Sequence, residues 1–108
     1  MITIPVTKTM ASAVLSINLN AIQNNYYTLV DHLGGVPSAA VVKADGYGLG
    51  AERVGEALAE AGCSVFFVAH LAEGIELRAA LPDTEIHILN GLLPDSLDAY
   101  RENLLFLF

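Results

Sequence analysis

The sequence predicts an α/β protein built from parallel β/α repeats, and three observations support this fold class. From residue 39 onward, short apolar runs alternate with amphipathic segments, and only brief turns separate them. The run Ala39–Lys43 is apolar on both faces up to its terminal lysine, which is typical of an interior strand of a parallel sheet. Of the 108 residues, 54% are hydrophobic and 16% are charged, a composition that excludes a disordered chain.

The N-terminal region differs from the repeats that follow it. Residues 1–11 show no periodicity, and we expect them to form a loose arm. Residues 12–19 end in an alternation of apolar and polar side chains, which predicts a half-buried strand. At Asn20 the apolar period becomes that of a helix. We therefore expect a helix with Asn20 as its N-cap and Gly34-Gly35 as its stop.

Each later element follows from its own pattern. Short apolar runs predict strands, whereas apolar residues three or four positions apart predict helices. Gly62 follows the first of these helices as its C′ residue, Pro82 closes the second, and Asp95 or Ser96 caps the third. In chain order we expect strand Ala39–Lys43, helix Ala51–Ala61, strand Ser64–Ala69, helix His70–Leu81, strand Glu85–Gly91, helix Pro94–Asn103 and strand Leu104–Phe108.

The last predicted strand, "LLFLF", has no turn, cap or polar tail after it. We therefore expect the sequence to be the first part of a longer protein, truncated within a strand. A (β/α)8 barrel needs about 250 residues, and the strands after residue 20 would form its first half. Residues 20–108 are then a partial barrel domain. A doubly wound sheet is the alternative.

Charge and apolar run length argue against several classes of function. The net charge of −7 and the pI near 4.6 disfavour nucleic acid and anionic membranes, because both attract basic surfaces. No apolar run approaches the roughly 20 residues of a membrane span. The N-terminus is not ordered like a signal peptide, since its apolar stretch follows the candidate cleavage site. The single cysteine, Cys63, excludes an internal disulfide and fits a reducing cytoplasm.

Lys43 is the residue that most suggests chemistry. It ends the predicted strand at its carboxyl edge, where parallel α/β folds bind ligands and carry catalytic residues. A partly desolvated amine is more readily neutral, and a neutral amine is a nucleophile that forms Schiff bases with carbonyls. The alternative is a lysine that extends to solvent and pairs with Asp45.

The loop after Lys43 carries glycines at alternate positions and one tyrosine. Gly46, Gly48 and Gly50 allow tight turns and the close approach of a ligand. The spacing G-x-G-x-G is not the dinucleotide fingerprint G-x-G-x-x-G, and a P-loop would place its lysine after the glycines. Tyr47 is either a surface residue or a hydrogen-bond donor to a phosphate.

Taken together, "VVKADGYGLG" resembles the pyridoxal phosphate attachment motif of the alanine racemase family. The segment "LSINLNAIQNNY" is similar to the family's passage from an N-terminal strand into its first helix. The segment "HLAEGIELRAAL" is similar to its second helix, which bears a glutamate and an arginine. The resemblance covers residues 15–108, and Leu49 stands where family members usually carry histidine.

The resemblance implies a fold, a cofactor and a reaction. The fold is a TIM-type (β/α)8 barrel, and residues 12–19 would pair with a C-terminal β-domain beyond residue 108. Lys43 would hold pyridoxal 5′-phosphate as a Schiff base, Tyr47 would donate a hydrogen bond to its phosphate, and Val41 would line the pocket. The enzyme would interconvert L-alanine and D-alanine through a Cα carbanion, with Lys43 as one of two bases, and would serve D-alanine biosynthesis.

The resemblance also implies a cytoplasmic homodimer whose second base is a tyrosine from the other subunit's C-terminal domain. Tyr26, Tyr27 and Tyr100 lie on predicted helices, away from the edge that carries Lys43. The 108 residues alone are therefore expected to be inactive. The substrate of the whole enzyme is expected to be alanine. Neither nucleic acid nor a membrane is expected as a partner.

Two other functions stay open: a non-catalytic pyridoxal phosphate-binding barrel protein, and a related decarboxylase of basic amino acids. The "KADGYG" segment favours the racemase, because the lysine segments of both alternatives typically lack this tyrosine-glycine pair.

Other polar residues suggest weaker alternatives. His70 and Glu73 could share a metal ion, but no third ligand has a suitable spacing. Cys63 is expected to be a small buried residue rather than a nucleophile. Glu73, Glu76 and Arg78 are expected to form a solvated helix face.

Overall fold

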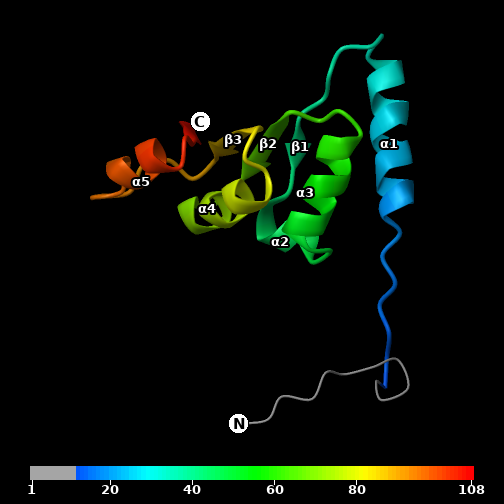
Figure 1. Ribbon diagram of the computed structural model, residues 1–108, viewed down its shortest axis with the longest axis horizontal. Coiled ribbons are helices and arrows are strands. Elements are labelled where there is room, and N and C mark those ends of the chain that lie inside the picture. Colours follow the sequence, from blue (N-terminus) through cyan, green and yellow to red (C-terminus); the bar gives the residue numbers. More distant parts are fainter. Residues whose placement is uncertain (1–11) are drawn as a thin grey trace.

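A computed structural model describes residues 12–108 and shows a four-stranded parallel sheet packed against helices (Figure 1). The strands lie side by side in chain order, β1-β2-β3-β4. The elements are α1 Leu19–His32, β1 Ala40–Val41, α2 Lys43–Tyr47, α3 Ala51–Glu60, β2 Val65–Val68, α4 Leu71–Ala80, β3 Glu85–Ile88, α5 Leu97–Glu102 and β4 Phe106–Leu107. The predicted parallel β/α order is confirmed. The unbroken spatial order suits a barrel, because a doubly wound sheet reverses its strand order at a switch point.

The two faces of the sheet differ in how they are covered. Phe66 and Ile86 are fully buried and pack with helix residues such as Leu77 in the core. On the other face the strand register aligns one row of four side chains: Val41, Phe67, His87 and Phe106. The two ends of that row are 45% and 48% exposed. Burial on both faces, as expected from the apolar strands, is therefore found on only one face within residues 12–108.

Helix α1 lies beside α3 at one end of the sheet, and α5 lies at the other end (Figure 1). The side-chain amide of Gln23 donates to the carbonyl oxygen of Ala57 over 2.7 Å and joins these two helices. Tyr26 is buried, and its hydroxyl donates to the carbonyl oxygen of Ser38 over 3.2 Å. Gly34 and Gly35 have φ of 69° and 86°, so the helix stops where the glycines predict.

The strand predicted over residues 12–19 is not formed within the described chain, and its expected pairing with a further domain stays a prediction. Residues 12–18 extend away from the sheet and form no strand, because no other strand of the described chain lies beside them (Figure 1). The helix starts at Leu19 with Asn18 as its N-cap, and Asn18 Oδ1 accepts the N–H of Ala21 over 3.0 Å. The expectation of Asn20 as N-cap was wrong by two residues. Residues 1–11, expected to be an arm, lie outside the described part.

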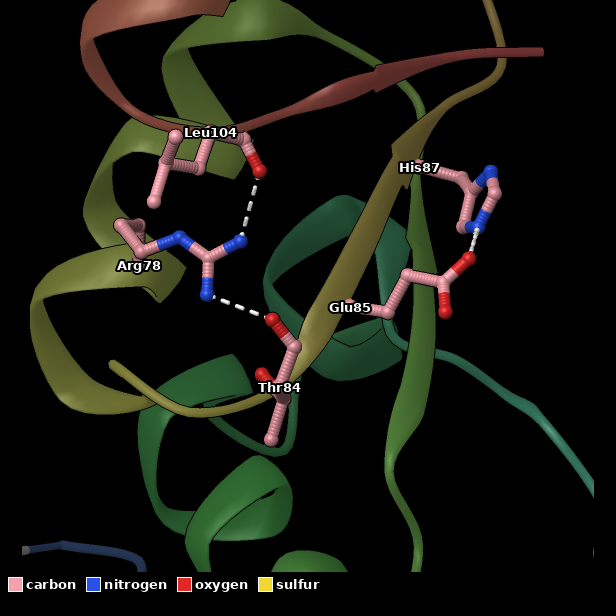
Figure 2. Close-up of polar contacts among 5 residues, drawn as sticks. All are labelled: Arg78, Thr84, Glu85, His87 and Leu104. Carbon is pink, nitrogen blue, oxygen red and sulfur yellow. Dashed lines mark hydrogen bonds and ion pairs between the residues drawn. The ribbon is translucent and has the colours of Figure 1, made fainter.

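Arg78 holds the amino-terminal edge of the sheet together. Figure 2 shows its guanidinium between the carbonyl groups of Thr84 and Leu104, which precede β3 and β4. It donates to the carbonyl oxygens of Asn103 at 2.9 Å, Leu81 at 3.0 Å, Pro82 at 3.4 Å, Thr84 at 2.6 Å and Leu104 at 2.8 Å. The expectation of a solvated Arg78 was wrong. Helical periodicity places Arg78 off the apolar stripe but does not reveal the strand ends that its long side chain reaches.

A cavity of about 810 Å³ lies at this same edge, between α5 and the starts of β3 and β4. It is therefore at the opposite end of the strands from Lys43. Within residues 12–108, no helix combines the length and the apolar character that a membrane span requires.

Candidate functional site

Lys43 lies at the carboxyl edge of β1, as its position in the sequence predicts. The N–H of Val42 makes the last sheet hydrogen bond, to the carbonyl oxygen of Phe67 over 2.9 Å. Val42 is 2% exposed beneath the helices, whereas Lys43 is half-buried. Among the described residues, no carboxylate forms an ion pair with the Lys43 amine, so the alternative pairing with Asp45 is not found.

The chain leaves β1 through a left-handed turn. Ala44, Asp45 and Tyr47 have φ of 51°, 52° and 56°, and Gly48 at the end of the turn has φ of 86°. The N–H of Gly48 donates to the carbonyl oxygen of Ala44 over 3.0 Å, which closes the turn. A left-handed backbone costs roughly 1–2 kcal/mol for each residue other than glycine. Such conformations persist where their surroundings hold them, and they gather at functional sites.

Asp45 ties this turn to α3. Its Oδ1 accepts the N–H of Ala51, the first residue of α3, over 2.9 Å, and its carbonyl oxygen accepts the N–H of Gly50 over 2.8 Å. Gly46 is buried against the same helix start, and a β-carbon there would lie 3.2 Å from the Ala51 nitrogen. The glycine at this position therefore serves a close contact between two backbone segments.

Glu73 ties the same turn to the end of β2. Its Oε2 accepts the N–H of Ala44 over 2.7 Å. Its Oε1 accepts the N–H of Ala69 over 3.1 Å and the N–H of His70 over 2.9 Å. The expectation of a solvated Glu73 was wrong. The signal that could have found it is its place three residues after His70, because a glutamate at that position of a helix reaches back to the free N–H groups.

Tyr47 stands at the end of the turn with 61% of its surface exposed. Its hydroxyl has no hydrogen-bond partner among residues 12–108. The hydroxyl of Tyr100, by contrast, donates to the carbonyl oxygen of Gly91 over 2.9 Å. Tyr47 thus offers a phenol without a partner in the described chain, on the same turn as Lys43, and the neighbouring Leu49 is 39% exposed.

The carboxyl edge continues from β2 to β3 through His70. Its Nδ1 lies 3.2 Å from Nδ2 of Asn90, which follows β3. His70 and Glu73 meet through the His70 backbone N–H and not through an imidazole–carboxylate pair. In the part of the chain that the structure describes, no three His, Cys, Asp or Glu side chains are arranged to hold a metal ion.

Cys63 is 2% exposed, and its Sγ lies 3.4 Å from the carbonyl oxygen of Val65. Burial raises the pKa of the thiol above its ordinary value of 9.0. A protonated, enclosed thiol is a poor nucleophile, so the prediction of a small buried residue is confirmed.

The sequence did not reveal the aromatic and acidic neighbours of His87. Its ring stacks between Phe67 and Phe106, with ring centres 4.8 Å and 5.0 Å away. Its Nε2 lies 2.7 Å from Glu85 Oε1, and the two side chains point toward one another in Figure 2. Its Nδ1 is buried without a partner in the described chain. A histidine in a strand carries no sequence signal for such a stack.

Comparison with known proteins adds a family to this geometry. Residues 17–106 match the model of the family described as "Alanine racemase, N-terminal domain". An alanine racemase of Methylobacterium sp. (strain 4-46) is 52% identical over 91 residues, which are 84% of this chain and 25% of that protein. A catabolic alanine racemase of Mesorhizobium japonicum is 55% identical over 93 residues, which are 85% of this chain and 24% of that protein.

Solved structures agree in fold. The alanine racemase of Bartonella henselae, solved with covalently bound pyridoxal phosphate, superposes with a TM-score of 0.79 at 39% identity, over 84% of this chain and 26% of that chain. The alanine racemase of E. faecalis gives a TM-score of 0.78 at 34% identity, over 84% and 25%. The chain thus spans about a quarter of the length of the relatives that it matches.

Proposed function

Because the chain belongs to the alanine racemase N-terminal domain family, we propose that it is the cofactor-attaching part of an enzyme that interconverts L-alanine and D-alanine. The observation that carries the proposal is the amine of Lys43, which stands at the carboxyl edge of a parallel sheet on a strained left-handed turn. The full-length enzyme is then the protein that contains this segment and has the length of these relatives.

The groups at this edge fit pyridoxal 5′-phosphate, which the family resemblance and the Bartonella structure suggest as cofactor. The cofactor carries an aldehyde and a phosphate. Lys43 offers a primary amine without an ion-pair partner among residues 12–108, and Tyr47 offers an unpartnered hydroxyl on the same turn. An amine suits the aldehyde and a phenol suits the phosphate.

In this proposal each residue has a defined task. When bound, the cofactor withdraws electrons from the Cα–H bond of the amino acid. Lys43 holds the cofactor covalently and, when the substrate replaces it, takes or returns the Cα proton on one face. Tyr47 donates a hydrogen bond to the phosphate and fixes its position. Asp45 and Glu73 keep the backbone between these two residues in its left-handed form.

A second base is needed on the other face of the substrate. The hydroxyls of Tyr26 and Tyr100 both donate to backbone carbonyl groups, which argues against either as that base. We propose that a tyrosine of the other subunit of a homodimer supplies it. We also propose that the enzyme is cytoplasmic and acts in D-alanine metabolism. Its cytoplasmic location suits the free cysteine at position 63, because the cytoplasm keeps thiols reduced.

Borohydride reduction tests the attachment site. The segment has only two lysines, Lys8 and Lys43. The full-length enzyme loaded with pyridoxal 5′-phosphate should lose its visible absorption band on reduction, and the label should lie on Lys43. Lys43→Ala should abolish labelling of this segment and racemisation, whereas Lys8→Arg should leave both unchanged. A label on any other lysine contradicts the proposal.

Tyr47→Phe tests the phosphate contact. The change removes one hydrogen bond to a charged group, worth about 1.5–3 kcal/mol, so the Kd for the cofactor should rise about tenfold to a hundredfold. Tyr27→Phe is the matched control, because Tyr27 is exposed on α1. An unchanged Kd in Tyr47→Phe contradicts the assignment. Cofactor binding without any racemisation would favour a non-catalytic carrier.

A further inference from the structure

Within the described chain, Glu73 is the only residue of α4 whose side chain makes a hydrogen bond to the turn after Lys43. Its two oxygens divide their contacts: Oε2 takes the N–H of Ala44 at 2.7 Å, and Oε1 takes those of Ala69 and His70 at 3.1 Å and 2.9 Å. Hydrogen bonds from N–H groups to a carboxylate are among the stronger ones in proteins. The carboxylate therefore links the carboxyl ends of β1 and β2 through backbone atoms alone.

The bond to Ala44 acts directly on Lys43. The N–H of Ala44 belongs to the peptide unit that starts at the Lys43 carbonyl group, and peptide units are planar. The direction of that N–H consequently fixes the backbone torsion ψ of Lys43. This is the first peptide unit of the turn, and it leads into residues that hold unfavourable positive φ values.

The far end of the turn has its own anchor in Asp45, which bonds the start of α3. Asp45 lies inside the turn and moves with it, whereas Glu73 lies outside the turn, on a helix that follows β2. The two carboxylates therefore act on different properties of the turn. Asp45 fixes the conformation of the turn against α3, and Glu73 fixes the position of the turn relative to β2.

We propose that Glu73 is a positioning residue for Lys43, which holds the amine in reach of cofactor and substrate by fixing the first peptide unit of the left-handed turn. This inference rests on the proposed function. Glu73 touches neither the cofactor nor the reacting atoms in this scheme, and its effect passes through the backbone of Ala44.

The test compares Glu73→Gln with Glu76→Gln in the full-length enzyme. Glutamine has nearly the shape of glutamate, but it has only one acceptor oxygen, so one of the two strand ends is left facing an NH₂ group. Glu76 lies one turn further along the same helix and is exposed, and its side chain makes no hydrogen bond in the described chain. It is therefore the matched control for the loss of one charge on α4.

Three measurements are made below the melting temperature of both variants. In Glu73→Gln the kcat for alanine should fall about tenfold to a hundredfold with little change in KM, since small displacements of a reacting group cost rates of this size. Pyridoxal phosphate should reattach to the stripped enzyme more slowly by a similar factor. Amide hydrogen exchange should quicken in residues 43–50 but not in α3. Glu76→Gln should resemble the unmodified enzyme in all three.

A kcat and a reattachment rate equal to those of Glu76→Gln would overturn the proposal, even if Glu73→Gln melts at a lower temperature. Should Glu73→Gln fail to fold, an ester in place of the amide between Lys43 and Ala44 decides the question. It deletes the single N–H that Oε2 accepts and leaves the bonds to Ala69 and His70 intact. The ester should reproduce the loss of kcat, and a kcat like that of the all-amide enzyme would overturn the proposal.

The labelling of Lys43 separates this inference from the proposed function. If the cofactor label lies elsewhere, the proposed function fails. If the label lies on Lys43 and Glu73→Gln behaves like its control, only the positioning role fails.

Discussion

Replacing Arg78 with methionine should loosen the amino-terminal edge of the sheet without disturbing the candidate site. Methionine keeps an unbranched apolar side chain but donates no hydrogen bond. Arg78→Met therefore leaves the guanidinium's backbone acceptors, among them the carbonyl groups of Thr84 and Leu104, without this donor. Thr84 immediately precedes β3, and Leu104 lies between α5 and β4. The effect should therefore concentrate in β3 and β4.

The size of the effect follows from the contacts. A hydrogen bond to a charged group contributes about 1.5–3 kcal/mol, and a neutral one about half as much. Four of the contacts are 3.0 Å or shorter, but two of these share Nη1, and part of the set is exposed, so water recovers some of the loss. We therefore expect a loss of about 2–4 kcal/mol in local stability, which is about 30-fold to 700-fold in the opening equilibrium.

Native-state hydrogen exchange of the full-length enzyme measures this loss by region. Amides of β3 and β4 should exchange about 30-fold to 700-fold faster, and the exchange rates of the α3 amides should not change. Arg101→Met is the matched control, since Arg101 is exposed on α5 and its side chain makes no hydrogen bond in the described chain. Exchange in Arg78→Met equal to that in Arg101→Met would refute the reasoning.

Three further substitutions test the packing and the turn. Gly46→Ala adds a β-carbon 3.2 Å from the Ala51 nitrogen at φ of 63°, so cofactor affinity, measured by absorbance titration, should fall about fivefold to thirtyfold, the factor that about 1–2 kcal/mol of strain represents. Gly74→Ala places a β-carbon 2.5 Å from Cδ1 of buried Ile88 and should lower unfolding free energy by about 1–3 kcal/mol, measured by denaturant titration, while unchanged stability would mean that Ile88 repacks freely. The folded state holds the Cys63 proton more tightly than the unfolded chain, so stability is lost as pH rises above about 9. Cys63→Ala removes this titration, so its denaturation midpoint should fall less steeply as the pH rises above about 9 than the midpoint of the unmodified enzyme.

The sequence predicts the fold well because its signals are local. Apolar runs and glycine stops mark β2, β3 and the ends of the helices to within three residues, and the largest differences are at the end of β3 and the start of α5. The exception is residues 12–18, where alternation predicts a strand. A strand exists only when another strand supplies its hydrogen bonds, and no alternation pattern reveals whether that partner is present.

The candidate site is predictable in part. Lys43 and Tyr47 stand out because a lysine and a tyrosine interrupt an apolar and glycine-rich stretch. Glu73 does not, because its partners are backbone N–H groups brought near by the parallel pairing of β1 and β2, and one of them lies 29 residues away. Backbone partners have no residue type, so a sequence pattern cannot identify them. Glutamate spacing at the helix start could have identified only the contact with His70.

The uncovered face of the sheet connects these features. Val41 is the last strand residue before the turn, and it starts the row that continues through Phe67 and His87 to Phe106. Apart from His87 this row is apolar, it is about half exposed at both ends, and it is directly adjacent to the turn that carries Lys43. In the proposed function the Lys43 amine attaches a cofactor and moves a Cα proton, and such steps are favoured where water is excluded and electrostatic interactions are strong. Covering this face would supply that environment, and the energy gained by burying its apolar surface would at the same time stabilise the strand on which Lys43 depends. Cofactor chemistry and burial of the open face are therefore expected to be coupled. A polar substitution at Phe67 would weaken both, although Phe67 lies one strand away from the lysine.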